Sequence, residues 1–204
     1  MDESSATEYS VGERHRLILN FWFGDSEAPS EYGQQRKIWF RKSPQFDQEI
    51  RQKFLSDYRH AVAGNYDHWQ HQPRPCLALI LLLDQFPRNL FRDSPQAFAT
   101  DERAHQIAEY ALHQGFDEQL IPVERMFVYL PLEHQEDLSC QQRCVDLFEQ
   151  LVAIAPELAS SLDYARRHRD VIARFGRFPH RNGILNRTNT PEEAEFLRQP
   201  GSRF

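Results

Sequence analysis

The seven consecutive apolar residues from Leu77 to Leu83 constrain the fold more than any other part of the chain. A helix made from them has no polar face, so it must be surrounded by protein on all sides. The run is too short to cross a bilayer. Four polar residues follow it within two turns: Asp84, Gln85, Arg88 and Asn89. The pattern therefore predicts a polar site at the end of the most buried helix of the molecule.

The rest of the chain shows helical periodicity and no sustained two-residue alternation. Proline, glycine and capping residues divide it into seven to nine helices joined by short connections, which favour antiparallel neighbours. We expect Ser43, Asp137 and Thr190 to begin helices, Gly24, Gly64, Gly115 and Gly176 to end them, and the pair Phe86-Pro87 to end the central one. The expected inward-facing residues include Val62, Leu138, Tyr164 and His168. The fold class is all-α: helix–turn–helix pairs in a compact bundle around a central apolar helix.

Length and composition indicate one domain in the cytoplasm. In a chain of 204 residues we expect a flexible tail at residues 1–9 and a single helical domain over residues 10–204. The N-terminus lacks the apolar stretch of a signal peptide, and no run of apolar residues is long enough for a membrane partner. Three cysteines are too few for a disulfide framework. The net charge of −6 argues against general binding to nucleic acid.

A short string occurs twice. Phe86-Pro87-Arg88-Asn89 follows the central helix, and Phe178-Pro179-His180-Arg181-Asn182 follows the last long one. Each string places a buried phenylalanine and a helix-breaking proline before arginine and asparagine donors. We expect the same chemistry at both helix ends, with the donors facing carbonyl groups or an anion.

Four longer strings carry a resemblance to a known family. They are LLLDQFPRNLFR at 81–92, ERMFVYLPLEHQED at 124–137, RFGRFPHRNGILNR at 174–187 and TPEEAEFL at 190–197. The chain resembles the bacterial family known as domain of unknown function 924 from Ile18 onward. The resemblance implies an all-helical fold similar to the tetratricopeptide-repeat superfamily and implies no activity. The family pattern has serine where this chain has Gln135 and glycine where it has Asn186.

Charge is segregated near the C-terminus. Between residues 166 and 187 a single acid, Asp170, accompanies seven arginines: Arg166, Arg167, Arg169, Arg174, Arg177, Arg181 and Arg187. Arginine pairs two oxygens of a carboxylate or phosphate, so the cluster indicates an anion site. The same arginines can instead tie helices together by pairing with acids elsewhere in the chain: Asp84, Glu124, Glu133, Glu136 and Asp137.

The candidate ligand-binding residues are Arg88, Asn89, Arg125, Arg177, His180, Arg181 and Asn182, which we expect to meet in one central pocket faced by Glu133 and His134. His180, His134 and Glu133 are the candidate catalytic residues, with a histidine as general base. No known metal-binding spacing or phosphate-binding glycine loop is present, so we expect neither a metal nor a cofactor. Nucleophilic catalysis has no motif in support.

Three functions are compatible with these residues. The first is binding of a small anionic molecule or a peptide carboxylate. The second is a hydrolase acting on a phosphorylated or carboxylated metabolite, with the arginines stabilising negative charge. The third is an interaction module whose polar residues serve only as ion pairs. The sequence does not decide among them, nor whether the chain is an enzyme, nor its oligomeric state.

Overall fold

The computed structural model describes residues 11–28 and 32–202. These residues form helices and turns and no β-strand, which confirms the all-α prediction. The tail expected at residues 1–9 lies outside the described residues. Within them, no helix is both long enough and apolar enough to span a membrane.

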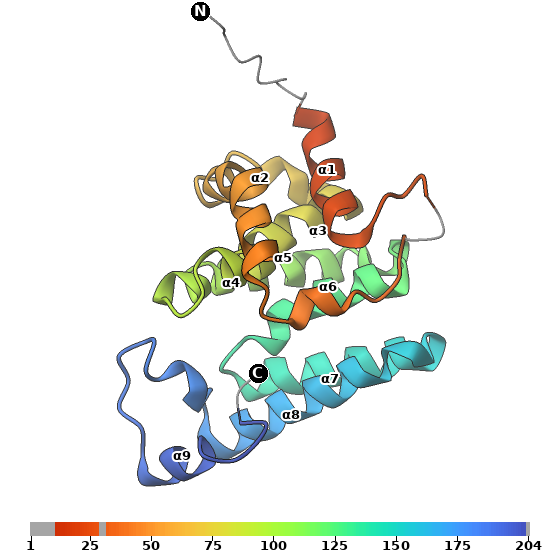
Figure 1. Cartoon of the computed structure of the whole chain (residues 1–204). Helices are drawn as coiled ribbons and strands as arrows, with labels where there is room; N and C mark the ends of the chain where they lie inside the picture. Colours follow the sequence, from red (N-terminus) through yellow and green to blue (C-terminus); the bar gives the residue numbers. More distant parts are fainter. Residues whose placement is uncertain (1–10, 29–31, 203–204) are drawn as a thin grey trace, which may run out of the picture.

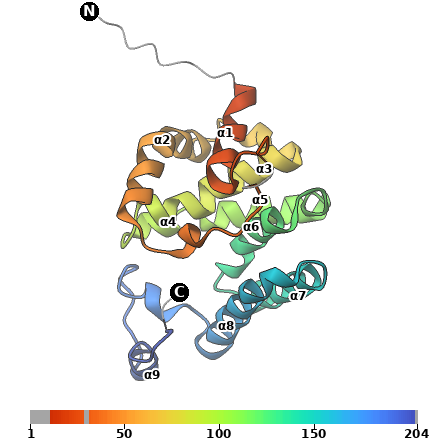
Figure 2. The same ribbon diagram turned by 45° about the vertical axis from the view of Figure 1, so that its right-hand side comes forward.

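The longer helices form an upper body and a lower layer (Figures 1 and 2). In both views α7 and α8 lie side by side below α1 to α6, and α9 follows beneath the end of α8. The α-helices are α1 (Val11–Phe23), α2 (Pro44–Val62), α3 (Pro73–Ile80), α4 (Phe86–Leu90), α5 (Asp101–His113), α6 (Pro122–Glu133), α7 (Leu138–Ile154), α8 (Ala159–Phe175) and α9 (Pro191–Phe196). The short helical turns are η1 (Lys37–Phe40), η2 (Asp67–His71), η3 (Leu81–Gln85), η4 (Pro95–Phe98), η5 (Asp117–Gln119), η6 (Pro156–Leu158) and η7 (Pro179–Arg181).

Local capping explains where several helices begin and end. The side chain of Ser43 accepts a hydrogen bond from the backbone of Phe46, and Asp137 does the same for Cys140. Thr190 and Glu193 form a reciprocal capping box at α9. α8 ends at Gly176, whose φ of 67° is a left-handed conformation that glycine adopts without strain. These caps were predicted from the sequence.

The central helix does not end at Phe86-Pro87, contrary to the prediction. Instead α3 continues through η3, a π-helical turn, into α4. Within this turn the backbone N–H of Phe86 donates to the carbonyl of Leu81, five residues back. Such a turn is one residue wider than an α-helical turn and often occurs at functional sites.

Pro87 accounts for the wide turn. In an α-helix its missing N–H would have bonded the carbonyl of Leu83, and its ring would have crowded that carbonyl. The hydroxyl of Thr100 donates to the Leu83 carbonyl instead, at 2.5 Å. A side chain from the start of α5 therefore satisfies the carbonyl group that proline leaves open, and the chain stays helical.

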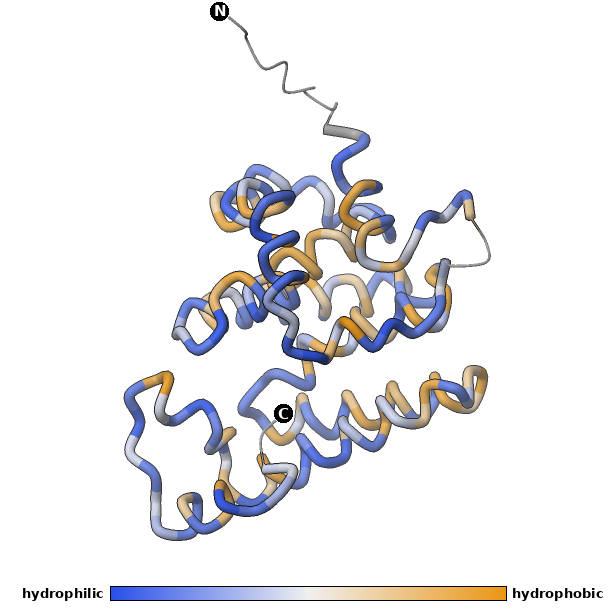
Figure 3. Tube along the Cα trace, in the orientation of Figure 1, coloured by the Kyte–Doolittle hydropathy of each residue, from blue (hydrophilic) through white to orange (hydrophobic). Residues whose placement is uncertain are grey.

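The apolar run lies in the centre of the core. Every side chain from Leu77 to Leu83 is fully buried, as predicted. Aromatic rings share this core with it, among them Trp22 and Phe127 from other helices and Phe86 from the continuation of the same helix. In the hydropathy colouring of Figure 3, much of the middle of the upper body is orange, the colour of hydrophobic residues. A second, smaller cluster around Phe178 packs the C-terminal segment against the end of α8.

Three expected core residues are exposed instead. Val62 belongs to a pattern that repeats every four residues from Phe46, and four such steps rotate about 160° around a 3.6-residue helix. It therefore faces solvent at the end of α2. Leu138 is exposed because it is the first residue of α7. Tyr164 lies off the buried stripe of α8, which runs through Leu162, Ala165, His168 and Val171. His168 is buried as predicted.

Candidate functional site

Asp84 is the most deeply buried charge-bearing side chain in a cluster that we call the polar centre. The polar centre comprises Asp84, Gln85, Arg88, Asp101, Glu133, His134, His168, His180 and Arg181. One oxygen of Asp84 lies 2.6 Å from Nδ1 of His134, and the other accepts from Nε2 of Gln85, also at 2.6 Å. Burial raises the pKa of this carboxyl, but its contacts with His134, Arg88 and Gln85 together outweigh burial and hold the pKa below its usual value. Asp84 is therefore ionised at neutral pH.

His134 is placed by the end of α6, where it is the first residue after the helix. Its carbonyl accepts a hydrogen bond from Nη1 of Arg181 at 3.1 Å. Because Nδ1 faces the Asp84 carboxylate, that nitrogen carries a proton, and Nε2 is left for other partners. The side chain is 14% exposed, so water reaches it.

The two repeated strings meet at one acid. Arg88, from the first string, donates to Asp101 at 2.8 Å, and Arg181, from the second, lies 3.6 Å from the same carboxylate. Both guanidinium groups also lie 4.7 Å from the ring centre of Phe98. The two strings therefore share an acid, Asp101 at the start of α5, although the first string lies within a continuous helix and not at a helix end as expected.

Arg181 is unusually buried for an arginine. Only 6% of the residue is exposed, and its Nε is buried without a hydrogen-bond partner in the described part of the chain. Burial, and after it the charge of Arg88, lowers the pKa of Arg181 to about 10. Its cation is still protonated at pH 7, and the acids that counter its charge are first Asp101 and then Glu136 and Asp84.

The other titratable groups of the polar centre are uncharged at neutral pH. Burial, and then the charge of Asp84, raises the pKa of Glu133 to about 8. Burial lowers the pKa of His168 to about 3, and burial followed by Arg181 lowers the pKa of His180 to about 4. Oε1 of Glu133 lies 3.4 Å from Nδ1 of His168. A pKa of about 4 makes His180 a weak base, which leaves His134 as the better candidate of the two.

The structure does not bring all of the predicted ligand-binding residues together. Asn89 donates to Asp47 on α2. Arg125 pairs with Asp117. On α6, Arg125 lies about 12 Å from Glu133 along the helix axis at the usual helical rise. Arg177 and Asn182 both bond Glu193 on α9. Local acids outside the polar centre hold these four side chains, and only Arg88, His180 and Arg181 join Glu133 and His134.

Most of the C-terminal arginines have acid partners of their own. Five of the seven form separate pairs: Arg166–Glu149, Arg169–Asp170, Arg174–Glu192, Arg177–Glu193 and Arg187–Glu136. Arg167 lies over the ring of Tyr164. Arg181 differs from them because it shares its acid with Arg88. Structural pairing, one of the two alternatives, therefore accounts for these five arginines.

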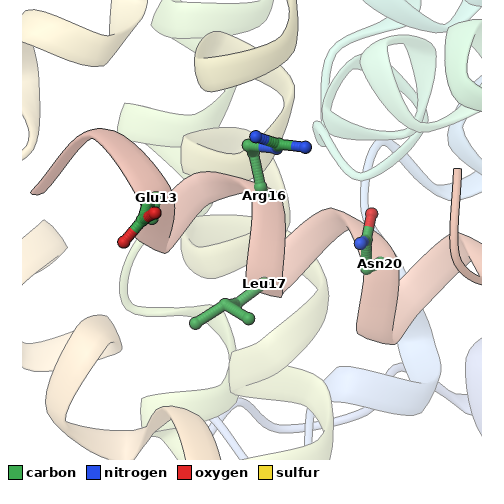
Figure 4. Close-up of a pocket in the computed structure, with 4 residues that line it drawn as sticks. All are labelled: Glu13, Arg16, Leu17 and Asn20. Carbon is green, nitrogen blue, oxygen red and sulfur yellow. The ribbon is translucent and has the colours of Figure 1, made fainter. Parts of the chain in front are cut away.

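Other candidate chemistry is weaker. Sγ of Cys140 lies 3.6 Å from Nε2 of His105, but burial raises the pKa of this thiol to about 11, so it is not an activated nucleophile. The described residues contain no group of three metal-binding side chains. A hollow of about 200 Å³ on the surface of α1 is lined by Glu13, Arg16, Leu17 and Asn20, all from one helix (Figure 4). It is not part of the polar centre.

Asp101 and Phe98 were missed in the sequence. Acids in the first turn of a helix commonly complement the helix dipole, so Asp101 looked ordinary there. Phe98 matched an apolar helical pattern. The only hint in the sequence was that Phe98, Thr100 and Asp101 stand close together at the start of a helix. That Arg88 and Arg181 reach the same acid is visible only in the folded chain.

Comparisons with known proteins agree with this fold. A family model described as bacterial protein of unknown function (DUF924) matches residues 18–201. The chain belongs to the DUF924 family. The DUF924 chain is also similar to the solved structure of ATU0120, a protein of unknown function from Agrobacterium tumefaciens. The two are 38% identical with a TM-score of 0.80, over 93% of this chain and 99% of that one. A comparison with curated proteins found no match.

The two departures from the DUF924 pattern now have structural settings. Asn186 has a φ of 53°, a left-handed conformation that glycine adopts freely and asparagine tolerates best among the other residues. Gln135 lies in the turn after α6, and its carbonyl accepts from Gln141 at 2.8 Å. Asn186 therefore replaces glycine at a position where backbone conformation matters.

Proposed function

We propose that this DUF924 protein binds a small anionic molecule, or the carboxylate of a peptide, beside Arg88, Arg181, His134 and His180. The observation that carries the proposal is the pair of guanidinium groups on one carboxylate, Asp101. A buried cation without a full counter-charge is costly, and an anion that joins the pair lowers that cost. The unsatisfied Nε of Arg181 supplies a further donor.

The partial exposure of the site supports the proposal. The side chain of Arg88 is 21% exposed and that of His134 is 14% exposed, so solvent reaches both. Arg181 is more deeply buried, and its guanidinium lies 4.7 Å from the ring centre of Phe98 and 4.5 Å from that of Phe178. A few convergent polar groups next to aromatic rings are typical of small-molecule sites.

The test is a calorimetric titration at low ionic strength with acetate, succinate, inorganic phosphate and sulfate. Arg181→Lys keeps the charge and removes the planar fork that pairs two oxygens. We expect this substitution to weaken the affinity for the most tightly bound of the four anions at least tenfold, which corresponds to about 1.4 kcal/mol of binding free energy. Arg166→Lys is the matched control, because Arg166 forms a surface pair with Glu149.

Two results contradict the proposal. One is a wild-type protein that binds none of the four anions at millimolar concentration. The other is an Arg181→Lys protein that binds as tightly as Arg166→Lys. Either result favours the reading in which the polar centre holds helices together and the protein acts through its outer faces.

A second candidate function is hydrolysis of an anionic ester. The observation in its favour is the 2.6 Å contact between Asp84 and His134, in which a buried carboxylate orients an imidazole and leaves Nε2 for water. In this reading His134 is the general base and Asp84 is its positioning residue. Release of nitrophenol from mono-4-nitrophenyl succinate, lost in His134→Gln and kept in His113→Gln, would support it. No release by the wild-type protein counts against it.

A further inference from the structure

The segment from Arg36 to Lys42 combines positive charge with aromatic side chains. It reads RKIWFRK and holds two of the three lysines in a chain that has 21 arginines. No acid occurs between residues 32 and 46. The protein as a whole carries a net charge of −6, so this segment forms a local basic region on an otherwise acidic molecule.

The turn η1, which lies inside this segment, is anchored to the end of α1. The side chain of Arg36 donates to the carbonyls of Phe21 and Trp22, at 2.7 and 2.8 Å. Trp39 is buried, and its indole N–H donates to the same Trp22 carbonyl at 3.0 Å. These contacts hold the backbone of η1 in place, so that the next side chain, Phe40, is presented to solvent on a fixed support.

The exposed side chains of this segment are Lys37, Phe40, Arg41 and Lys42, which we call the basic aromatic patch. Phe40 is 64% exposed. Lys42 lies 3.8 Å from Asp93, but both side chains are largely in solvent, so this ion pair is weak. Within the described part of the chain, Lys37 and Arg41 have no acid within ion-pair distance, so their charges face solvent.

We propose that the basic aromatic patch binds the surface of a membrane that contains anionic phospholipids. A single exposed apolar side chain is common on proteins, but here three cations accompany it. The cations face the lipid phosphates, and the ring of Phe40 enters the layer between headgroups and acyl chains. Reversible attachment of this kind takes an apolar and an electrostatic contribution together, and the patch supplies both.

The use of lysine favours a lipid surface over a protein partner. Arginine and aromatic residues are enriched in protein–protein interfaces, whereas lysine is depleted there. Elsewhere this chain holds carboxylates with arginine, as in the two-pronged pair of Arg187 with Glu136. A lysine acts as a point charge without fixed acceptor geometry, which suits the mobile headgroups of a bilayer. The expectation of no membrane partner rested on the lack of a long apolar run, and attachment to a surface needs no such run.

The experiment is cosedimentation of the full chain with sucrose-loaded vesicles at pH 7 and low ionic strength. One set of vesicles is phosphatidylcholine alone, and the other contains one-third phosphatidylglycerol. We expect the wild-type protein to bind the second set at least tenfold more tightly, and sodium chloride to weaken this binding because it screens exposed charges. Lys37→Glu removes two units of positive charge, each contributing about fivefold in affinity, and should weaken binding at least tenfold at low salt.

Phe40→Ser separates the apolar contribution from the electrostatic one. It should weaken binding several-fold at every salt concentration, because burial of apolar surface is not a charge interaction. Ile154→Ser is the matched control, since Ile154 is also 64% exposed and no lysine or arginine occurs between residues 147 and 158. Arg59→Glu, at an exposed position near the other end of α2, controls for the change in net charge. Both controls should bind within about twofold of the wild type, and thermal melts check that all four variants fold.

Three outcomes overturn the inference. The first is equal binding of the wild-type protein to both sets of vesicles, or binding to neither. The second is a loss in Lys37→Glu or Phe40→Ser that is no larger than in the controls. The third is a different occupant: tighter binding to polyglutamate or to a double-stranded oligonucleotide than to the anionic vesicles, or a dimer in light scattering that Phe40→Ser dissociates. None of these outcomes affects the proposed anion site, which lies on other residues.

Discussion

Asp84 shows how a single buried charge can organise its surroundings. A fully buried carboxylate is costly unless hydrogen bonds and counter-charges replace water. Here both oxygens are bonded, by His134 and Gln85, and Arg88 lies 3.9 Å away. Pairing of Asp84 with an arginine was one alternative drawn from the sequence, but its closest contacts are with Gln85 and with His134, a histidine fifty residues later in the chain, each at 2.6 Å.

Replacement of Asp84 by asparagine tests this arrangement. The amide cannot neutralise Arg88, so we expect a loss of about 3–5 kcal/mol in the free energy of unfolding. Urea melts of Asp84→Asn and of Asp146→Asn, an exposed control, provide the comparison. The control should lie within about 0.5 kcal/mol of the wild type. Equal midpoints for both variants would place Asp84 outside the ionic network.

Glu133 should make the folded state less stable as the pH rises. The folded state keeps its proton up to a pKa of about 8, whereas the unfolded chain releases it near the ordinary value of 4.5. The folded state therefore binds more protons between these values, and its stability falls as pH rises through that window. His168 and His180 act in the opposite direction, because their lowered pKa values make stability fall as pH drops below 6.5.

Glu133→Gln should remove the loss of stability with rising pH that Glu133 causes. Glutamine resembles the protonated carboxyl and cannot ionise. Relative to wild type, we expect the variant to gain about 2 kcal/mol of unfolding free energy between pH 6 and pH 8. Denaturant melts at pH 6, 7 and 8 measure the difference. A gap between the two proteins that does not change with pH would show that Glu133 ionises normally in the folded state.

At the scale of elements, the π-helical turn η3 places Asp84 and Gln85. The turn exists because Pro87 interrupts the bonding of a helix that the core keeps continuous. Thr100 completes it by bonding the Leu83 carbonyl. α5 thus supports the central helix with Thr100 and the arginine pair with the next residue, Asp101.

A double-mutant cycle tests the partnership between Pro87 and Thr100. Thr100→Val leaves a buried carbonyl without a donor and should cost about 1–3 kcal/mol. In a Pro87→Ala background the new N–H of residue 87 can bond the same carbonyl, so the cost of Thr100→Val should fall by at least half. Thermal or urea melts of the four proteins give the coupling energy. Strict additivity would mean that Thr100 acts elsewhere.

At the scale of the whole molecule, one apolar helix holds the upper body together, and the C-terminal segment closes over its polar end. The smaller cluster around Phe178 fixes that segment, so that Arg181 reaches α5 and the carbonyl that follows α6. The polar centre is thus assembled from the π-helical turn η3, the helices α4, α5, α6 and α8, and the turn η7 of the second Phe-Pro string.

Truncation of the central helix should destabilise the whole protein. Leu81→Ala and Leu82→Ala each remove a fully buried side chain, and we expect losses of about 2–5 kcal/mol. Leu138→Ala, at a half-exposed position, is the matched control and should change stability by less than about 0.5 kcal/mol. Losses at Leu81 and Leu82 no larger than at Leu138 would show that the helix is peripheral.

The sequence by itself determined what depends on neighbours along the chain. Helical periodicity, the caps at Ser43, Asp137 and Thr190, and the burial of Leu77–Leu83 follow from spacing and from residue chemistry within a few turns. The similarity of the two Phe-Pro strings was visible in the same way. Errors arose where a local rule met a tertiary contact, as at Pro87, where a threonine from another helix kept the chain helical.

Only the tertiary structure decided which charges meet. Each arginine can pair with any acid within reach, and sequence spacing does not constrain contacts between residues dozens of positions apart. Arg125 pairs with Asp117 and Arg177 pairs with Glu193. Arg88 and Arg181 instead both contact Asp101. The protonation states of Glu133, His168 and His180 depend on burial in the same way, because the removal of water by distant segments sets their pKa values.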